Sequence, residues 1–323
     1  MLTEVMENYS LIKEFRKAGY YETAHQKQMF KDIKAAISSG RLVVLTGIVG
    51  CGKTVTLRRL QETLEKEGKI LVSKSLSVDK NRATLATLIS ALFYDLSAEK
   101  DIKISTQGEK RERELRDLIK KGKKPVVLFV DEAHDLHSST LTGLKRLIEV
   151  VEDGGGTLSV VLAGHPKLKN DLRRPTMEEI GYRATVFSLD SLIGSQREYI
   201  GWLLNACTGE DTQIFDLLEA SAIDMLAMRL RTPLQIEQHL TLALEEAYQV
   251  GEKPVTAAIV ESILSKDINE LEPNLTRHGY NVKSLAEQFN TKPADIRSLF
   301  RGQLDPVRTR ELQEQMLSAG LPL

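Results

Sequence analysis

The sequence predicts an α/β protein in which helices cover a parallel sheet, followed by a helical region. Short apolar, β-branched runs alternate with amphipathic helical segments through the first 190 residues. One of these runs ends in a glycine-rich loop and another ends in two acidic residues. Strand patterns stop at about residue 191, and the remainder of the chain has helical periodicity. Alternating strands and helices favour a parallel sheet whose two faces are both covered.

The apolar pattern places each element in order. Leu11, Ile12 and Phe15 recur at helical spacing in the N-terminal part, and the run 42–47 has the composition of a strand buried on both faces. The elements expected after it are a helix at 53–68 ended by Gly68, a strand at 69–78, a helix at 83–96, a strand at 126–130, a helix at 139–153, and strands at 157–164 and 184–189.

Four segments are expected from these patterns. Residues 1–40 form an N-terminal helical segment, and residues 41–190 form a nucleotide-binding α/β domain. Residues 191–270 form a helical lid. A cluster of Pro, Asn and Gly before residue 280 separates a small helix-turn-helix-like module at 271–323.

Composition restricts the class of protein. The formal net charge of −1 means that any surface for a polyanion must be a local basic patch. The two cysteines, Cys51 and Cys207, have no metal or disulfide spacing and suit a reducing compartment. Apolar runs are much shorter than the ~20 residues of a membrane-spanning helix. We therefore expect a cytoplasmic protein without membrane contact.

The stretch GIVGCGKT, residues 47–54, fits the phosphate-binding P-loop pattern between a strand and a helix. Glycines let backbone N–H groups converge on phosphates, and the helix N-terminus adds partial positive charge. We expect Lys53 to reach the β- and γ-phosphates of ATP and Thr54 to bind Mg²⁺. The expected nucleotide-binding residues are Gly47, Ile48, Val49, Gly50, Cys51, Gly52, Lys53, Thr54, Val55 and Asp131.

The stretch VVLFVDEAH, residues 126–134, is a buried strand that ends in acidic residues. Asp131 is placed to hold Mg²⁺, and Glu132 is placed to polarise the water that attacks the γ-phosphate. The letters DEAH also occur in a helicase motif, but the chain is too short for two tandem motor domains. The sequence predicts a site that hydrolyses ATP.

With these motifs, residues 20–260 resemble the AAA+ ATPases. The resemblance implies a polar "sensor 1" residue at the end of a further strand, and His165, after Gly164, takes that position. It also implies an arginine finger that reaches the nucleotide of a neighbouring subunit. Arg183 precedes a strand-like run as in the family pattern, while Arg173 and Arg174 remain alternatives.

The lid departs from the family pattern at one position. Many AAA+ lids carry Gly-x-Pro-Arg, whose arginine is sensor 2, whereas this sequence reads RTPLQI at 231–236. Leu234 stands where that arginine is expected, and Arg231 occupies the glycine position. The sequence therefore predicts a lid without the usual sensor 2 arginine at this position.

The string VLAGHPKLKNDLRRPTMEEIGYR, at 161–183, resembles the transposition ATPases of the TnsC, TniB, IstB and MuB group, which are related to the ExeA/GspA type. The resemblance implies binding of double-stranded DNA by an ATP-dependent homo-oligomer, as a ring or a helical filament, and recruitment of a transposase. It further implies DNA contacts after the second strand, where Lys74, Lys80 and Arg82 lie. The alternatives are a secretion ATPase and a nucleotide-gated regulatory switch that reads one DNA site.

The C-terminal stretch 281–302 predicts two short helices split by NTKP. Lys292, Arg297 and Arg301 would lie on or beside the second helix, as in a DNA-reading helix pair. A small bundle that contacts another protein is the alternative interpretation. The sequence leaves both open.

Overall fold

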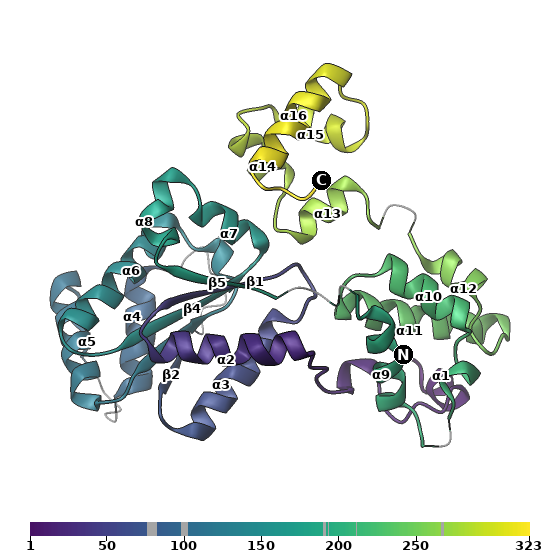
Figure 1. Cartoon of the computed structure of the whole chain (residues 1–323), viewed down its shortest axis with the longest axis horizontal. Coiled ribbons are helices and arrows are strands. Elements are labelled where there is room, and N and C mark those ends of the chain that lie inside the picture. Colours follow the sequence, from purple (N-terminus) through teal and green to yellow (C-terminus); the bar gives the residue numbers. More distant parts are fainter. Residues whose placement is uncertain (76–82, 98–102, 190–191, 193, 211, 266–267) are drawn as a thin grey trace. The chain divides into compact units, whose positions relative to one another are not determined.

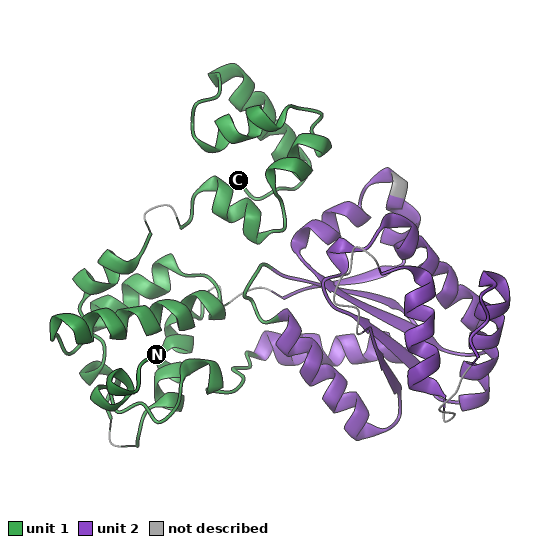
Figure 2. Cartoon of the chain, turned by 180° about the vertical axis from the view of Figure 1, so that it is seen from behind, with its two compact units in different colours: residues 1–23, 48–52, 190–323 green, residues 24–47, 53–189 purple. Residues whose placement is uncertain are grey.

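The computed structural model describes the chain except for residues 76–82, 98–102, 190–191, 193, 211 and 266–267. It divides into two compact units, shown in different colours in Figure 2. Unit 1 comprises residues 1–23, 48–52 and 190–323, and unit 2 comprises residues 24–47 and 53–189. The domain boundary expected at 190/191 falls on residues outside the described set.

Unit 2 contains a five-stranded sheet with the order β2-β3-β4-β1-β5, in which every pairing is parallel (Figure 1). The predicted α/β fold with a parallel sheet is confirmed. The strands are β1 (Leu42–Thr46), β2 (Leu71–Lys74), β3 (Val126–Val130), β4 (Leu158–Gly164) and β5 (Ala184–Ser188).

Helices connect these strands and cover the sheet. The segments of unit 2 are α2 (Ala24–Ser38), α3 (Lys53–Glu67), α4 (Leu85–Leu96), α5 (Gly108–Gly122), η3 (Ala133–Asp135), α6 (Ser138–Asp153), α7 (Pro166–Leu172), η4 (Pro175–Met177) and α8 (Glu178–Gly181). Every residue of β1, β3 and β4 is buried, as expected for central strands covered on both faces.

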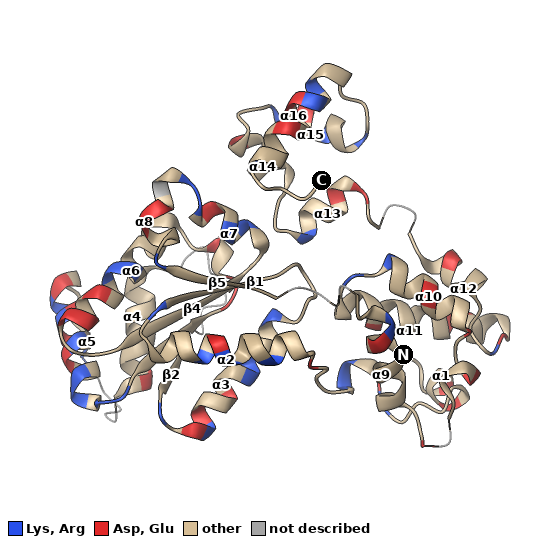
Figure 3. Ribbon diagram, in the orientation of Figure 1, with Lys and Arg blue, Asp and Glu red and all other residues tan. Residues whose placement is uncertain are grey.

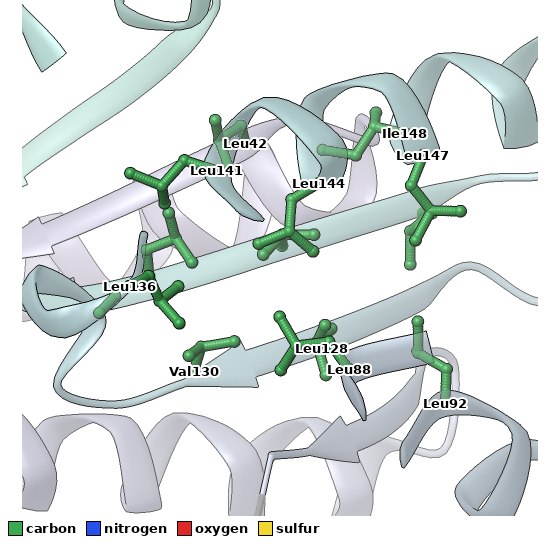
Figure 4. Packing of buried hydrophobic residues seen from close by; sticks show 14 of the residues in the cluster. Leu42, Leu88, Leu92, Leu128, Val130, Leu136, Leu141, Leu144, Leu147 and Ile148 are labelled. Carbon is green, nitrogen blue, oxygen red and sulfur yellow. The ribbon is translucent and has the colours of Figure 1, made fainter. Parts of the chain in front are cut away.

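Alternate residues of the central strands point to opposite faces of the sheet. Leu128 and Val130 of β3 pack in one cluster with residues of α4 and α6, among them Leu88 and Leu144 (Figure 4). Helix α2 contacts β1, β4 and β5, and helix α3 contacts β2 and β4. The core therefore fixes the strand ends that carry the predicted site.

The strand order places three loops side by side. Strand β1 lies between β4 and β5, and β4 lies between β3 and β1. The loops after β1, β3 and β4 thus emerge at the same edge of the sheet, because all three strands are parallel. The Gly47 N–H donates to the carbonyl of Gly164 at 3.2 Å, which ties two of these strand ends together.

Unit 1 is helical in its described residues, in agreement with the expected helical region. Its segments are α1 (Thr3–Asn8), η1 (Phe15–Lys17), α9 (Gln196–Cys207), η5 (Ile214–Asp216), α10 (Ala220–Arg229), α11 (Pro233–Val250), α12 (Ala257–Ile263), α13 (Leu271–Arg277), α14 (Val282–Gln288), α15 (Pro293–Phe300) and α16 (Pro306–Ser318).

Two apolar clusters organise unit 1. In the first, Val5 and Tyr9 from the N-terminus pack with α9 to α12, and the Ile12 N–H donates to the Cys207 carbonyl at 2.8 Å. In the second, residues of α13 to α16 surround Leu285 and Ile296. The N-terminal 23 residues therefore pack with α9 to α12, whereas α2 packs with the sheet.

Candidate functional site

The glycine-rich loop links β1 to α3, as predicted from the motif. Gly50 and Gly52 have φ of 81° and 97°, a region that side chains with a Cβ rarely adopt. Helix α3 begins at Lys53, whose side chain is buried and whose Nζ donates to the Gly47 carbonyl at 2.9 Å. The ammonium is thereby held against the end of β1, at the N-terminus of a helix.

Thr54 and Asp131 meet although β2, α4 and α5 separate them in the sequence. The Thr54 hydroxyl donates to Asp131 Oδ2 at 2.8 Å, and the Glu132 N–H donates to Asp131 Oδ1 at 2.9 Å. A hydroxyl and a carboxylate are hard oxygen donors, which is the donor set that Mg²⁺ prefers. These two residues fit the magnesium site that the motif predicts.

Glu132 follows Asp131 with a strained backbone. Its φ of 52° and ψ of 38° lie in the left-handed region, where a long side chain costs free energy. Its side chain is 46% exposed, so that water reaches the carboxylate. Strain of this kind at the end of a buried strand is typical of functional positions.

Two histidines face the Glu132 carboxylate. Its Oε2 lies 3.4 Å from His134 Nδ1 and 3.9 Å from His165 Nε2. The two imidazole rings stack, with centroids 3.8 Å apart and planes 22° from parallel. A Cβ on Gly164 would lie 3.2 Å from the His134 backbone nitrogen, so glycine permits this close approach. The structure thus brings His165 to the predicted acid.

Sequence reasoning missed His134. Its signal was present, because the residue lies two positions after Glu132 in the same DEAH stretch. Its proximity to His165 depends on the pairing of β3 with β4, in which Val130 is in register with Leu162.

Residues 35–172 match the family model described as "AAA domain". The match includes the glycine-rich loop, Thr54, Asp131, Glu132 and His165. The matched residues make up less than half of the chain.

A curated protein is similar to part of the chain. The chain is 34% identical over 146 residues to general secretion pathway protein A of Aeromonas hydrophila, a stretch that makes up 45% of this chain and 26% of that protein. The match thus spans about a quarter of the relative's length.

Solved structures resemble the chain over most of its length. Cdc6p of Pyrobaculum aerophilum matches with a TM-score of 0.56 and 15% identity, covering 96% of this chain and 91% of that one. A structure of Drosophila ORC bound to DNA matches with a TM-score of 0.55 and 14% identity, covering 97% and 82%. At these identities the likeness shows the fold alone.

The three candidate arginine fingers lie after residue 172, where the match to the family model ends. Arg183 precedes β5 and forms an ion pair with Glu149 of α6. Arg174 pairs with Asp171 at 2.9 Å, and Arg173 is exposed. The finger role of Arg183 stays a prediction.

The loop and the lid meet within unit 1, which includes residues 48–52. The Leu234 N–H donates to the Gly50 carbonyl at 3.3 Å, and a Cβ on Gly50 would lie 2.8 Å from the Leu234 Cβ. The Val49 N–H donates to the Arg277 carbonyl at 3.0 Å. Leu234 therefore contacts the loop through its backbone and an apolar side chain, where the family pattern has an arginine.

Of the three residues expected to contact DNA, the structure describes only Lys74. Lys74 ends β2 and forms an ion pair with Glu65 at 2.8 Å, while Lys80 and Arg82 lie outside the described residues. Along α5, acidic and basic side chains are interspersed (Figure 3). The pair between Glu109 and Arg113 at 2.5 Å shows that cations of α5 have partners on their own helix.

The C-terminal helices form a small body with its own core. Helix α14 is followed by α15, and Asn281 begins α14 with a capping box to Ser284. Lys292, Arg297 and Arg301 are exposed. The cations needed for a DNA-binding helix pair are therefore accessible, and the choice between DNA and protein contact stays a prediction.

No helix among the described residues is both long enough and apolar enough to cross a membrane.

Proposed function

We propose that this protein is an ATPase that hydrolyses magnesium-bound ATP. The observation that carries the proposal is the hydrogen bond from Thr54 to Asp131, with Glu132 as the next residue. It joins the two halves of a phosphate site, one after β1 and one after β3. Mg²⁺ bound by these two residues would neutralise negative charge on the phosphate oxygens.

Residues of the chain carry out phosphate binding, activation of the water and sensing of the γ-phosphate. Backbone N–H groups of the glycine-rich loop and the N-terminus of α3 bind phosphate oxygens, and Lys53 adds a fixed positive charge. Glu132, half exposed and beside two imidazoles, accepts a proton from water as that water attacks. In this proposal, His165 is the polar side chain that senses the γ-phosphate.

We further propose that the ATPase assembles on double-stranded DNA as a homo-oligomer and recruits a transposase. Support comes from the likeness of 161–183 to transposition ATPases and from exposed Lys292, Arg297 and Arg301 on the C-terminal helices. The fold likeness extends over 97% of the chain to a protein solved on DNA. In this proposal, Arg183 of one subunit completes the site of its neighbour.

A secretion ATPase is the second candidate function. The 34% identity to general secretion pathway protein A, over 146 residues, favours this function. It predicts co-sedimentation with cell-envelope fractions, which the transposition proposal does not.

Two substitutions test the ATPase proposal. Lys53→Ala removes the phosphate-binding charge and should abolish binding of a fluorescent ATP analogue. Glu132→Gln should retain ATP binding and lower turnover by about 10²–10⁴-fold, the usual contribution of a general base. Normal turnover in Glu132→Gln would show that another group activates the water.

DNA binding is tested separately by fluorescence anisotropy of a random-sequence duplex at low salt, with a non-hydrolysable ATP analogue, ADP or no nucleotide. The transposition proposal expects analogue-dependent binding together with an increase in assembly size in sedimentation. A footprint on one defined sequence would favour a regulatory switch instead. Absence of binding in all three nucleotide states would refute the DNA role and leave the ATPase proposal intact.

A further inference from the structure

A cluster of three potential metal ligands lies at the end of β3 and β4. One ligand atom from each of Glu132, His134 and His165 lies within 4.8 Å of the other two. We propose that these residues bind a transition-metal dication, for which Zn²⁺ is the appropriate probe. Two imidazoles and a carboxylate are a known set of zinc ligands, with water in the fourth position.

The distances approach those of a bound metal. Ligand atoms about 2.1 Å from a tetrahedral zinc ion lie about 3.4 Å from one another. Here Glu132 Oε2 lies 3.4 Å from His134 Nδ1 and 3.9 Å from His165 Nε2. The three ligand atoms all lie within 4.8 Å of one another. Because the two imidazole rings stack, one ring has to turn before both nitrogen lone pairs point at one ion.

The surroundings of His134 are compatible with a role as a metal ligand. His134 Nδ1 is buried and makes no hydrogen bond to a described residue, so it is available as a ligand atom. His134 Nε2, the other ring nitrogen, lies 3.7 Å from Asp135 Oδ1. Ligating histidines commonly donate from their second nitrogen to a carboxylate. At 3.7 Å no such hydrogen bond is formed here, but the Asp135 carboxylate is close enough to form one after a small movement of the ring.

The chemistry separates this cluster from the magnesium site. Thr54 and Asp131 offer only oxygen atoms, which suit Mg²⁺. The cluster offers two imidazole nitrogens, which favour zinc, nickel or copper(II) over magnesium. Millimolar Mg²⁺ should therefore not displace a zinc ion from it.

Occupation of the cluster has a consequence that rests on the proposed ATPase function. A Glu132 carboxylate bound to zinc cannot accept a proton from the attacking water. Zinc should thus inhibit ATP hydrolysis, and a chelator should restore it. Zinc binding itself requires no ATPase activity.

The test uses the full chain without a polyhistidine tag and without nucleotide, titrated with Zn²⁺ against a chromophoric chelator in the presence of Mg²⁺. We expect one equivalent to bind and both His134→Ala and His165→Ala to weaken binding by more than about tenfold. His25→Ala, an exposed histidine of α2, is the matched control and should bind as the wild type does. Cobalt(II) provides a second readout, because its visible absorption reports ligation by these side chains.

Circular dichroism checks that each variant is folded, and Glu132→Gln tests the third ligand with nearly unchanged shape. Failure of the wild type to bind zinc, or equal affinity in the wild type and both histidine variants, overturns the site. Normal zinc binding by a chain that never hydrolyses ATP would support the site and refute the proposed ATPase function.

Discussion

The Thr54 hydroxyl donates to Asp131 Oδ2 at 2.8 Å, although 77 positions of sequence separate the two residues. Thr54 lies in the first turn of α3, and Asp131 follows the last residue of β3. Buried strands hold both positions, because β1 and β3 each lie beside β4 in the sheet. The pair is therefore preorganised by the core before any ligand binds.

Thr54→Ala should weaken ATP binding by about tenfold in the presence of Mg²⁺, the effect expected for loss of one good oxygen contact. In the presence of a chelator, the affinities of the variant and the wild type should agree, because Thr54 acts through the metal. A titration with a fluorescent ATP analogue, with and without Mg²⁺, measures both. Thr54→Ser keeps the hydroxyl and is the matched control. An equal loss with and without Mg²⁺ would contradict the assigned role.

Glu132→Asn should raise the stability of the protein while it removes turnover. Glutamate is strained at φ 52°, whereas asparagine adopts the left-handed region at lower cost. The expected gain in the free energy of unfolding is at most about 1 kcal/mol. Urea denaturation followed by circular dichroism measures it, with Glu132→Gln as the control that keeps the strain. A loss of stability in Glu132→Asn would show that the backbone is not strained there.

Local motifs predicted most residues of the candidate nucleotide site. The near-continuous apolar runs of β1, β3 and β4 identify buried parallel strands, and the residues that follow them are defined by spacing alone. Gly47 to Thr54 and the acids Asp131 and Glu132 therefore needed no tertiary information. The same holds for the α/β class, because alternation of strands and helices is a local signal.

Relations between distant segments could not be predicted in this way. His134 reaches His165 because β3 pairs with β4, and strand order does not appear in a local pattern. The expected N-terminal segment 1–40 shows the same limit. Residues 1–23 pack with α9 to α12, and α2 packs with the sheet, although both parts have the same helical periodicity.

Glu237→Gln should stabilise unit 1 at neutral pH. Burial raises the pKa of the Glu237 carboxyl, while the hydrogen bond from Tyr199 at 2.8 Å partly opposes the shift. Because the pKa of Glu237 is higher in the folded than in the unfolded protein, its charged form destabilises the fold at pH values above the folded-state pKa. This cost disappears as the pH falls below the pKa of glutamate in the unfolded chain, about 4.3. Thermal unfolding of both proteins from pH 4 to pH 8 measures the difference.

The advantage of Glu237→Gln should therefore be present at pH 8 and vanish near pH 4. Glutamine still accepts the Tyr199 hydrogen bond, so packing is nearly unchanged. Glu198→Gln, a change at a carboxylate that lies 3.5 Å from the Tyr21 hydroxyl on an exposed surface, is the control. A difference between Glu237→Gln and the wild type that is independent of pH would rule out titration of Glu237 as its cause.

Arg297→Ala tests whether the C-terminal helices bind DNA. Arg297 is exposed in the last turn of α15. A cation that neutralises one phosphate contributes about 0.9 to the slope of log affinity against log salt, so the variant's slope should be smaller by about 1. Anisotropy titrations of a duplex at several salt concentrations measure the slope. Lys283→Ala, an exposed cation on α14 that lies 3.9 Å from Glu287, is the matched control and should leave the slope unchanged. If Arg297→Ala retains the wild-type slope, Arg297 makes no phosphate contact, and the protein-contact interpretation of these helices gains support.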